Sequence, residues 1–275
     1  MVLRVSSNCL KKTYIYIIFS HFIKNSNAIF YIKILGMIAG AGTGILRTML
    51  VKRENVADVI PVDAAINLLI VAGFKRAISD EVFALPLIYN CTSGGANPIT
   101  WREIESFALQ SIYKFPMKSL LWYPGGSFKR WTFYDRLCRI LFHYLPAVLI
   151  DACLTIVRKS RFMMRLSLRM TKSIQALEFF TINEWSWSNQ NVHKLHQMLE
   201  KSDPESLQTF DFDVKSLNWE SYFDHYVLGT RHFVLKEDPE TLNSSRKKLR
   251  VMQLLHFLVQ FAFIFVLYYL FRNCI

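Results

Sequence analysis

The sequence predicts a chain in three parts: an α/β segment, a mostly α-helical domain after it, and a transmembrane helix near the C-terminal end. Strand-like and helix-like stretches alternate between Gly40 and Ile112, which is typical of an α/β layer structure. Residues 130–200 show long helical stretches and few strand signals. Val251–Phe271 contains no Asp, Glu, Lys or Arg and is long enough to cross a bilayer.

Residues 1–38 form an atypical apolar leader dominated by Ile, Lys, Asn, Tyr and Phe. Its two apolar runs, Tyr14–Ile23 and Ala28–Ile38, are each shorter than the ~20 residues that a spanning helix needs. Two lysines precede the first run as in a signal peptide, but no convincing small-residue cleavage site follows. Because these amino acids have A/T-rich codons, we hypothesise that the leader is translated non-coding sequence at a mispredicted gene start.

Residues 39–125 carry the α/β pattern. The glycines of Gly40–Gly44 have the wrong spacing for a phosphate-binding loop, so we expect a close-packed turn there. Val56–Ile60 fits a buried strand that Pro61 ends. Asp63 can cap a helix over Ala64–Gly73. The spacing places three residues of this helix towards the core: Ile66, Leu69 and Ile70.

A second strand and a second helix are expected next. Leu85–Cys91 has strand character, and Thr92–Pro98 is a loop by composition. Thr100–Glu103 reads as a capping box at the start of a helix. One face of this helix carries apolar residues at helical spacing, namely Ile104, Ala108 and Ile112.

Residues 126–245 predict a helical C-terminal domain. Its first two helical stretches, Asp135–Tyr144 and Ala147–Val157, are separated by Pro146. The apolar run Leu145–Val157 is too short to span a membrane and contains Asp151. It fits either a core helix or an interfacial helix whose neighbouring basic residues contact lipid headgroups.

Residues 246–275 comprise a basic flank and the predicted membrane anchor. Four basic residues lie just before Val251 and only Arg272 follows Phe271, so the positive-inside rule places the body in the cytosol. Tyr268 and Tyr269 suit the membrane interface. The alternative is a buried C-terminal helix. His256 fits a polar packing residue rather than a ligand.

Composition restricts the chemistry. The net charge of +12 favours an anionic lipid surface or a phosphorylated ligand, because no nucleic-acid-binding motif is visible. The alternative is a basic surface that only contacts solvent. The five scattered cysteines argue against a disulfide framework or a zinc site. His193 and His196 lie three apart on a probable helix, but without an obvious Cys or carboxylate partner we expect no metal site. The sequence contains no G-x-G-x-x-G, and none of its tyrosines has a lysine four residues later.

A set of spaced segments also carries a family resemblance. The segments are residues 56–67, 88–93, 97–101, 180–191, 210–213, 217–219, Tyr222 and residues 226–231. In this order they resemble the alcohol-forming fatty acyl-CoA reductases, which are relatives of the extended short-chain dehydrogenases. The resemblance covers roughly residues 40–270 and identifies the chain with the C-terminal portion of that family.

The resemblance implies a fold, a reaction and a location. Residues 39–125 would be the remnant of a Rossmann-like NAD(P)-binding domain, and residues 126–245 the helical C-terminal domain of the family. The family reduces a long-chain fatty acyl-CoA with NADPH, through an aldehyde, to a primary alcohol. The implied partners are the long-chain acyl-CoA and membrane lipid, with no nucleic acid. The membrane would be that of the endoplasmic reticulum or the peroxisome.

The sequence departs from the family where the chemistry is done. The family's N-terminal half supplies a glycine-rich turn and a Tyr-x-x-x-Lys pair, and neither is present, so no catalytic or cofactor-binding residue can be assigned. The implied substrate-side candidates are Pro61, Val62 and Asp63, whose alternative role is packing and helix capping. We expect this polypeptide alone to show no NADPH oxidation. The alternative to a reductase is a non-catalytic, membrane-tethered fragment or binding module.

Overall fold

The computed structural model describes residues 36–79 and 87–274, which form two compact units. The expectations for the leader up to residue 35, and for the first two residues of the Leu85–Cys91 strand, lie outside the described residues. Unit 1 contains Val56–Thr100 and Glu184–Asn218. Unit 2 contains residues 36–55, Trp101–Asn183 and Trp219–Ile275. Both units therefore combine segments from the expected α/β and helical domains.

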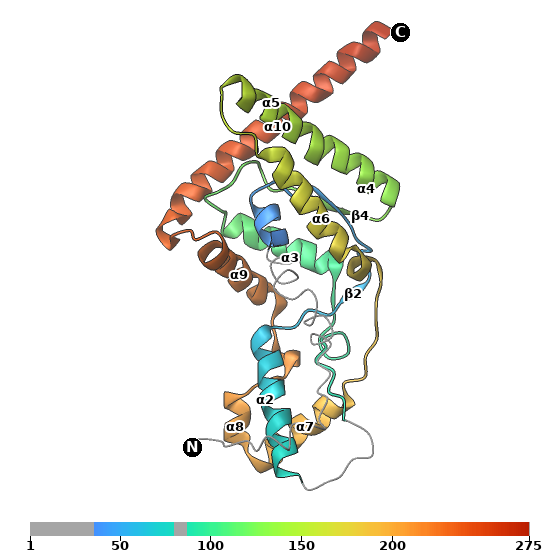
Figure 1. Ribbon diagram of the computed structural model, residues 1–275, viewed down its shortest axis with the longest axis vertical. Coiled ribbons are helices and arrows are strands. Elements are labelled where there is room, and N and C mark those ends of the chain that lie inside the picture. Colours follow the sequence, from blue (N-terminus) through green and yellow to red (C-terminus); the bar gives the residue numbers. More distant parts are fainter. Residues whose placement is uncertain (1–35, 80–86, 275) are drawn as a thin grey trace. The chain divides into compact units, whose positions relative to one another are not determined.

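Unit 1 is a small helical body with a single short antiparallel strand pair among its described residues. β2 (Val56–Ala57) pairs with β3 (Ile99–Thr100), so the expected strand at Val56–Ile60 is present but short. Its helices are α2 (Val62–Ile78), α7 (Gln190–Ser202), α8 (Pro204–Thr209) and the 3₁₀ turn η3 (Val214–Ser216) (Figure 1). The buried core is formed by Leu68, Val71, Ala72, Tyr89, Leu195, Leu199 and Phe212.

The expected core face of α2 was wrong. Leu68, Val71 and Ala72 are buried, whereas Ile66, Leu69 and Ile70 are between 43% and 49% exposed. Both sets have the same helical spacing, and the helix is apolar on most sides. Periodicity therefore could not choose between the two faces.

Residues 87–91 form no strand, which corrects the described part of the Leu85–Cys91 prediction. They are tied to the first turn of α7 and to the segment just before it by side chains rather than by a strand ladder. Asn90 Nδ2 donates to the Ser188 carbonyl at 2.8 Å, and Asn191 Nδ2 donates to the Ile88 carbonyl at 2.8 Å. The following loop at Thr92–Pro98 is confirmed.

Unit 2 contains a short parallel strand pair surrounded by helices. β1 (Thr48–Leu50) pairs in parallel with β4 (Ser127–Lys129), with Thr48 opposite Ser127. α3 (Trp101–Lys114) lies between these strands in the chain and buries Ile104, Ala108 and Ile112, as predicted. A parallel pair with an intervening helix agrees with the α/β expectation, but two strands are weak support for a Rossmann-like remnant.

The glycines before β1 are closely packed, as predicted, but Gly40 and Gly42 lie in the helical residues 36–42, and the turn is limited to Thr43 and Gly44. Gly44 has φ +78°, a conformation that L side chains rarely adopt. A Cβ at Gly44 would collide with the backbone of Trp122, and one at Gly42 would collide with the side chain of Met117. Protein atoms therefore fill the space beside these two glycines.

A continuous helix follows β4. It consists of α4 (Thr132–Arg139), the π-helical turn η2 (Ile140–Tyr144) and α5 (Leu145–Ile156). Pro146 therefore does not separate two helices, contrary to expectation. The wider π turn is the local feature that accommodates it: Leu145 N–H bonds to the Ile140 carbonyl, one residue further back than in an α-helix.

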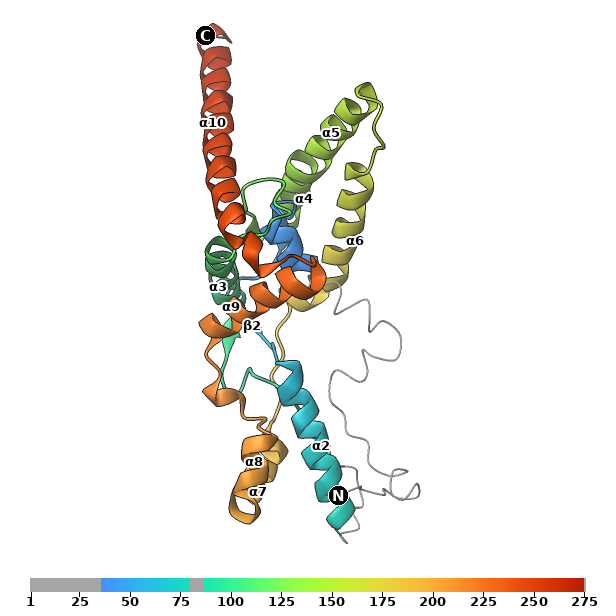
Figure 2. The same cartoon turned by 90° about the vertical axis from the view of Figure 1, so that its left-hand side faces the viewer.

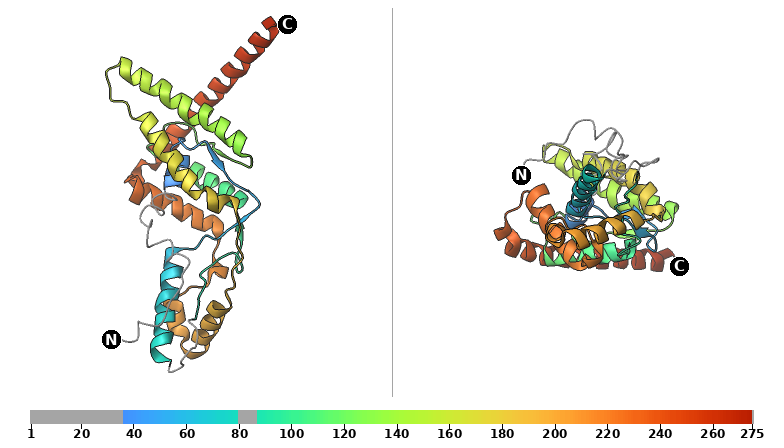
Figure 3. Two further views of the ribbon diagram at one scale, coloured as in Figure 1. Left: turned by 45° about the vertical axis from the view of Figure 1, so that its right-hand side comes forward. Right: turned by 90° about the horizontal axis from the view of Figure 1, so that it is seen from below.

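The remaining helices of unit 2 complete its body and lead out of it. α6 (Met163–Ile182) returns along α5, so that α5 and α6 form a hairpin (Figure 3, left). α9 (Trp219–Gly229) packs on α3 and continues into the π turn η4 (Thr230–Val234). The 3₁₀ turn η5 (Pro239–Thr241) then leads into α10 (Leu242–Cys274).

Candidate functional site

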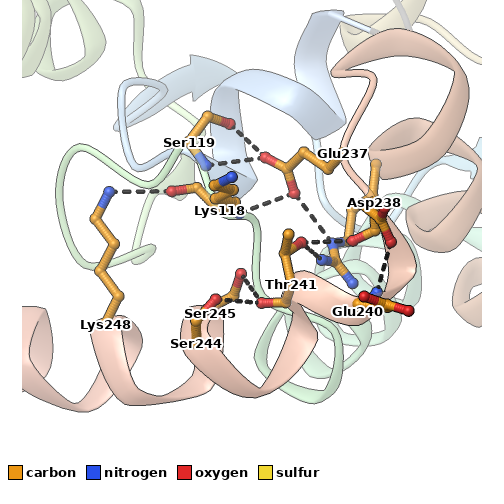
Figure 4. A network of polar contacts seen from close by, with 10 residues as sticks. Lys118, Ser119, Glu237, Asp238, Glu240, Thr241, Ser244, Ser245 and Lys248 are labelled. Carbon is orange, nitrogen blue, oxygen red and sulfur yellow. Dashed lines mark hydrogen bonds and ion pairs between the residues drawn. The ribbon is translucent and has the colours of Figure 1, made fainter.

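The base of α10 is held by one buried carboxylate (Figure 4). Glu237 is 7% exposed and accepts backbone hydrogen bonds from Lys118 N–H at 2.8 Å and Ser119 N–H at 2.9 Å. The Ser119 hydroxyl adds a third bond at 2.8 Å. Glu237 thereby ties the segment that enters α10 to the loop after α3.

Arg231 completes this arrangement, which we name the Glu237 clamp: Glu237, Arg231, Lys118, Ser119 and Thr241. Arg231 Nε donates to Glu237 Oε2 at 3.2 Å, and Arg231 Nη2 donates to Thr241 Oγ1 at 3.2 Å. Both charged side chains of the pair are at most 5% exposed. A buried ion pair needs such additional hydrogen bonds to offset the desolvation of its charges.

The hydrogen bonds of the clamp also set the pKa of Glu237. Burial alone would raise this pKa, but the bonds from Lys118, Ser119 and Arg231 outweigh burial and lower it from its ordinary value of 4.5. Glu237 is therefore a carboxylate at neutral pH, as the pairing with Arg231 requires.

Two cations of the first turns of α10 reinforce this attachment. Lys248 Nζ donates to the Lys118 carbonyl at 3.0 Å, and Arg246 donates to the carbonyl of Lys114, the last residue of α3, at 3.3 Å. The Lys114 carbonyl, at the end of α3, lacks an intrahelical partner. The basic flank predicted from sequence therefore attaches the helix to the body as well as preceding its apolar part.

The apolar part of α10 is not covered by other residues of unit 2. In the helical stretch Pro239–Arg272, the most apolar window has mean hydropathy 2.1 and none of it is buried. His256 marks where the body ends: Trp122 Nε1 donates to its Nδ1 at 3.2 Å, and the Tyr123 ring stacks on it at 5.6 Å. The prediction that His256 is a polar packing residue is confirmed.

A second helix is long and apolar enough to cross a membrane. The stretch Thr132–Ile156 has a window of mean hydropathy 1.6, of which 28% is buried. The structure therefore offers two candidate spans among the described residues, and the single C-terminal span stays a prediction.

The buried face of this second helix is polar. Thr48 Oγ1 donates to Asp135 Oδ1 at 2.7 Å, and Arg139 forms an ion pair with the same carboxylate. The backbone N–H of Arg47 donates to His143 Nε2 at 2.9 Å. Further along, Asp151 accepts three backbone hydrogen bonds at the start of α6, from Phe162, Met163 and Met164. Asp151 thus satisfies N–H groups that have no partner within α6.

The substrate-side candidates Pro61, Val62 and Asp63 lie at the start of α2 in unit 1. Pro61 is the residue before the helix, Val62 is 59% exposed, and Asp63 accepts only the local bond from Ala64 N–H at 3.1 Å among the contacts that the structure records. Within unit 1, the recorded contacts bring no other charged side chain to them. Their role near a substrate stays a prediction.

Unit 1 also contains a pocket of about 240 Å³ between the loop at residues 90–96 and α7. His193 and His196 both line it, together with Glu200 from the same helix. His196 packs edge-on against the ring of Phe212 at 5.6 Å. Within the described part of the chain, no group of three or more potential ligands is arranged to hold a metal ion.

Sequence reasoning missed Glu237 and Asp151 as organising residues. Arg231 was part of a segment that carried the family resemblance, but nothing local indicated its partner. Asp151 was noticed only as an interruption of an apolar run. In both cases the backbone groups that the carboxylate binds come from another segment.

Comparison with known proteins agrees with the predicted resemblance. A family model described as male sterility protein matches residues 142–237. The chain is 34% identical over 233 residues to fatty acyl-CoA reductase 2 of Mus musculus, covering 85% of this chain and 44% of that protein. It is 34% identical over 218 residues to fatty acyl-CoA reductase 1 of Xenopus laevis, covering 79% and 41%.

A human relative gives the same result. The chain is 31% identical over 227 residues to fatty acyl-CoA reductase 2 of Homo sapiens, covering 82% of this chain and 43% of that protein. The chain thus spans less than half the length of the curated relatives that it matches. The resemblance predicted from the spaced segments is confirmed: over most of its length the chain is similar to fatty acyl-CoA reductases, consistent with the C-terminal portion of that family.

Proposed function

We propose that this chain is the membrane-anchoring C-terminal part of an enzyme that reduces long-chain fatty acyl-CoA to primary alcohol with NADPH. The observation that carries this proposal is the 34% identity to a fatty acyl-CoA reductase over 85% of the chain. The long uncovered helix α10, attached to the body by the Glu237 clamp, supports membrane anchoring.

The Gly40–Gly44 segment does not fit the phosphates of NADPH. A dinucleotide needs a glycine turn whose backbone leaves room for phosphate. Here Met117 and the backbone of Trp122 fill the space beside Gly42 and Gly44. In the proposed enzyme the cofactor is therefore held by the part of the family's length that this chain does not match, and no step of hydride transfer is assigned to these residues.

Three of the predicted roles are carried into the proposal. Residues 39–125 end the nucleotide-binding domain. β1 of this segment pairs in parallel with β4, whose residues 127–129 lie just past its end. Residues 126–245 form the helical domain that covers the acyl chain. The turn Pro61–Asp63 lies on the substrate side of the nucleotide cleft.

A chimera tests the enzymatic role. The matching 233 residues of mouse fatty acyl-CoA reductase 2 are replaced by the corresponding segment of this chain, and fatty alcohol formed from a labelled long-chain acyl-CoA is measured with NADPH. We expect the chimera to form alcohol and this chain alone to show no NADPH oxidation. A folded, membrane-bound chimera without activity would instead support the non-catalytic binding module.

A second experiment tests the membrane anchor. We propose that α10 crosses the endoplasmic reticulum or peroxisomal membrane once, with the body in the cytosol. In isolated organelles, we expect the chain to resist carbonate extraction and an epitope in α7 to be digested by added protease. Replacing Leu258 and Phe261, both more than half exposed in the apolar part of α10, with Arg should release the chain into the supernatant. Retention of that variant in the membrane would contradict anchoring by α10.

A further inference from the structure

The helix formed by α4, η2 and α5 buries polar residues and exposes apolar ones. Its buried positions are mostly polar or charged, whereas a soluble helix normally buries its apolar residues. Asp135, Arg139, His143 and Asp151 are each at most 8% exposed. Their hydrogen bonds to Thr48, to Arg47 and to the start of α6 fix this polar face against the body of unit 2.

The opposite face is apolar and uncovered. Its large side chains lie between 41% and 79% exposed along the whole length of the helix. They are Phe133, Tyr134, Leu137, Ile140, Leu141, Phe142, Leu145, Val148, Leu149 and Ile150. An apolar stripe of this length is larger than the scattered apolar residues of an ordinary protein surface, so it needs an apolar partner.

The two ends of the stripe indicate which partner. At the C-terminal end, the turn between α5 and α6 combines exposed apolar and basic side chains. Ile156 is 81% exposed and Val157 is 60% exposed, and the exposed cations Arg158, Lys159 and Arg161 follow directly. Apolar residues next to Lys and Arg are the signature of a segment that enters the boundary between headgroups and acyl chains.

The N-terminal end of the stripe has interfacial aromatic residues beside cations. Trp131 is 69% exposed and lies 5.6 Å from the guanidinium of Arg130. Tyr134 is 50% exposed and lies 5.1 Å from the ammonium of Lys129. Trp and Tyr are enriched at the interface between membrane and water, and cations there are attracted by anionic lipid.

The turn after α5 holds an arginine in a backbone conformation that favours glycine. Arg158 has φ +55°, in the left-handed region that favours glycine at the end of a helix. Its backbone N–H still bonds to the Thr155 carbonyl at 3.1 Å, and Lys159 N–H bonds to the Leu154 carbonyl at 2.7 Å, so the turn is a regular helix end. An arginine at a position that suits glycine points to a role of its side chain outside the fold.

We propose that the apolar face of α4, η2 and α5, with the basic turn at Arg158–Arg161, is a second membrane-binding surface that prefers anionic lipid. This inference rests on the proposed anchoring by α10, which belongs to the same unit. The free part of α10 and the turn between α5 and α6 leave unit 2 at the same end (Figures 1 and 2), so one membrane can contact both. The anchor supplies attachment, and the second surface orients the body on the membrane.

Photocrosslinking of the full chain in vesicles tests this surface. The photoreactive residue p-benzoylphenylalanine replaces Ile156 in one variant and Gln175, an exposed residue of α6, in the control. The vesicles contain phosphatidylcholine alone or with about 30% phosphatidylserine. We expect lipid adducts at position 156 to exceed those at position 175 by about tenfold, and to be more abundant in the anionic vesicles.

Charge variants separate lipid attraction from a structural role. The triple variant Arg158→Gly, Lys159→Ser, Arg161→Ser should lower the adduct at position 156 in anionic vesicles to the level seen in neutral vesicles. Its turn remains stable because glycine suits the left-handed position. The control variant Lys194→Ser, Lys201→Ser, Lys215→Ser removes the same charge from exposed positions of unit 1 and should change nothing.

Vesicle flotation distinguishes failure of this inference from failure of the proposed function. A chain that floats with vesicles but forms no lipid adduct at position 156 overturns the second surface while α10 still anchors. A chain that neither floats nor forms the adduct overturns both. An adduct to protein instead of lipid, or an equal adduct in neutral and anionic vesicles, also overturns the proposal.

Discussion

The Glu237 clamp makes a strong prediction for the substitution Glu237→Gln, which keeps the shape of the side chain and removes its charge. Glu237 Oε1 accepts two bonds from Ser119, and Oε2 accepts one from Lys118 N–H and one from Arg231 Nε. If the glutamine oxygen keeps the two Ser119 bonds, its amide group replaces Oε2. The N–H group of Lys118 and the Nε–H group of Arg231 then face the amide NH₂ of the glutamine, which is itself a donor.

The cost follows from what is left unpaired. Removing one partner of a buried ion pair destabilises a protein by about 3–5 kcal/mol, because the remaining charge stays buried. Each buried donor left without an acceptor costs about 1–3 kcal/mol, and these costs overlap rather than add. We therefore expect Glu237→Gln to cost about 3 kcal/mol, which corresponds to roughly a hundredfold change in an equilibrium constant.

Hydrogen exchange of the chain in lipid nanodiscs can measure this locally. The protection factor of the Lys118 amide should fall by about a hundredfold, and that of Ser119 by less, because its acceptor is retained. The control is Glu240→Gln, since Glu240 is exposed and should change protection little. If Lys118 keeps the same protection in both variants, the clamp does not hold the base of α10.

Three further predictions follow from individual residues. Because the folded-state pKa of Glu237 is lowered, its contribution is fully present above its ordinary pKa of 4.5 and is lost as the pH falls through the folded value. Lys118 protection, corrected for intrinsic exchange rates, should therefore fall below pH 4.5 in the wild type but not in Glu237→Gln. Gly44→Ala should destabilise the fold by about 2 kcal/mol or more and lower its thermal unfolding midpoint, because the Gly44 φ is +78° and the Trp122 backbone occupies the Cβ position. The control Gly73→Ala should raise the unfolding midpoint slightly, because Gly73 lies within α2 and has open space at its Cβ position. Asp151→Ala should increase exchange at Phe162–Met164, whereas Asp203→Ala should leave these amides unchanged.

The comparison of α3 with α2 shows when the spacing of apolar residues identifies the buried face of a helix. α3 carries apolar residues at helical spacing on one face and polar residues elsewhere, and Ile104, Ala108 and Ile112 are buried as predicted. α2 is apolar around most of its circumference, so two faces satisfied the same spacing. What selects Leu68 over Ile66 is the position of α7 and of Phe212, which belong to a segment more than a hundred residues away.

The clamp could not be predicted for a related reason. The motif that carried the family resemblance ends at Arg231, yet the acceptor that neutralises this cation is Glu237, beyond an irregular turn. The groups that bind Glu237 are mainly backbone N–H donors of Lys118 and Ser119, which every residue except proline possesses. No side-chain pattern marks such donors in a sequence.

The helix of α4, η2 and α5 is longer than the apolar run recognised in the sequence. The run Leu145–Val157 contains Asp151 and is too short to span a membrane, so the sequence left both a core helix and an interfacial helix open. In the structure Asp135, Arg139 and Asp151 are turned towards the body, where each has hydrogen-bond partners. Because the polar residues face inwards, the outer face is apolar over the whole length of the helix. The average composition of a helix is therefore a poor guide to its surroundings when its polar residues are satisfied on one side, and the uncovered side determines what it can bind.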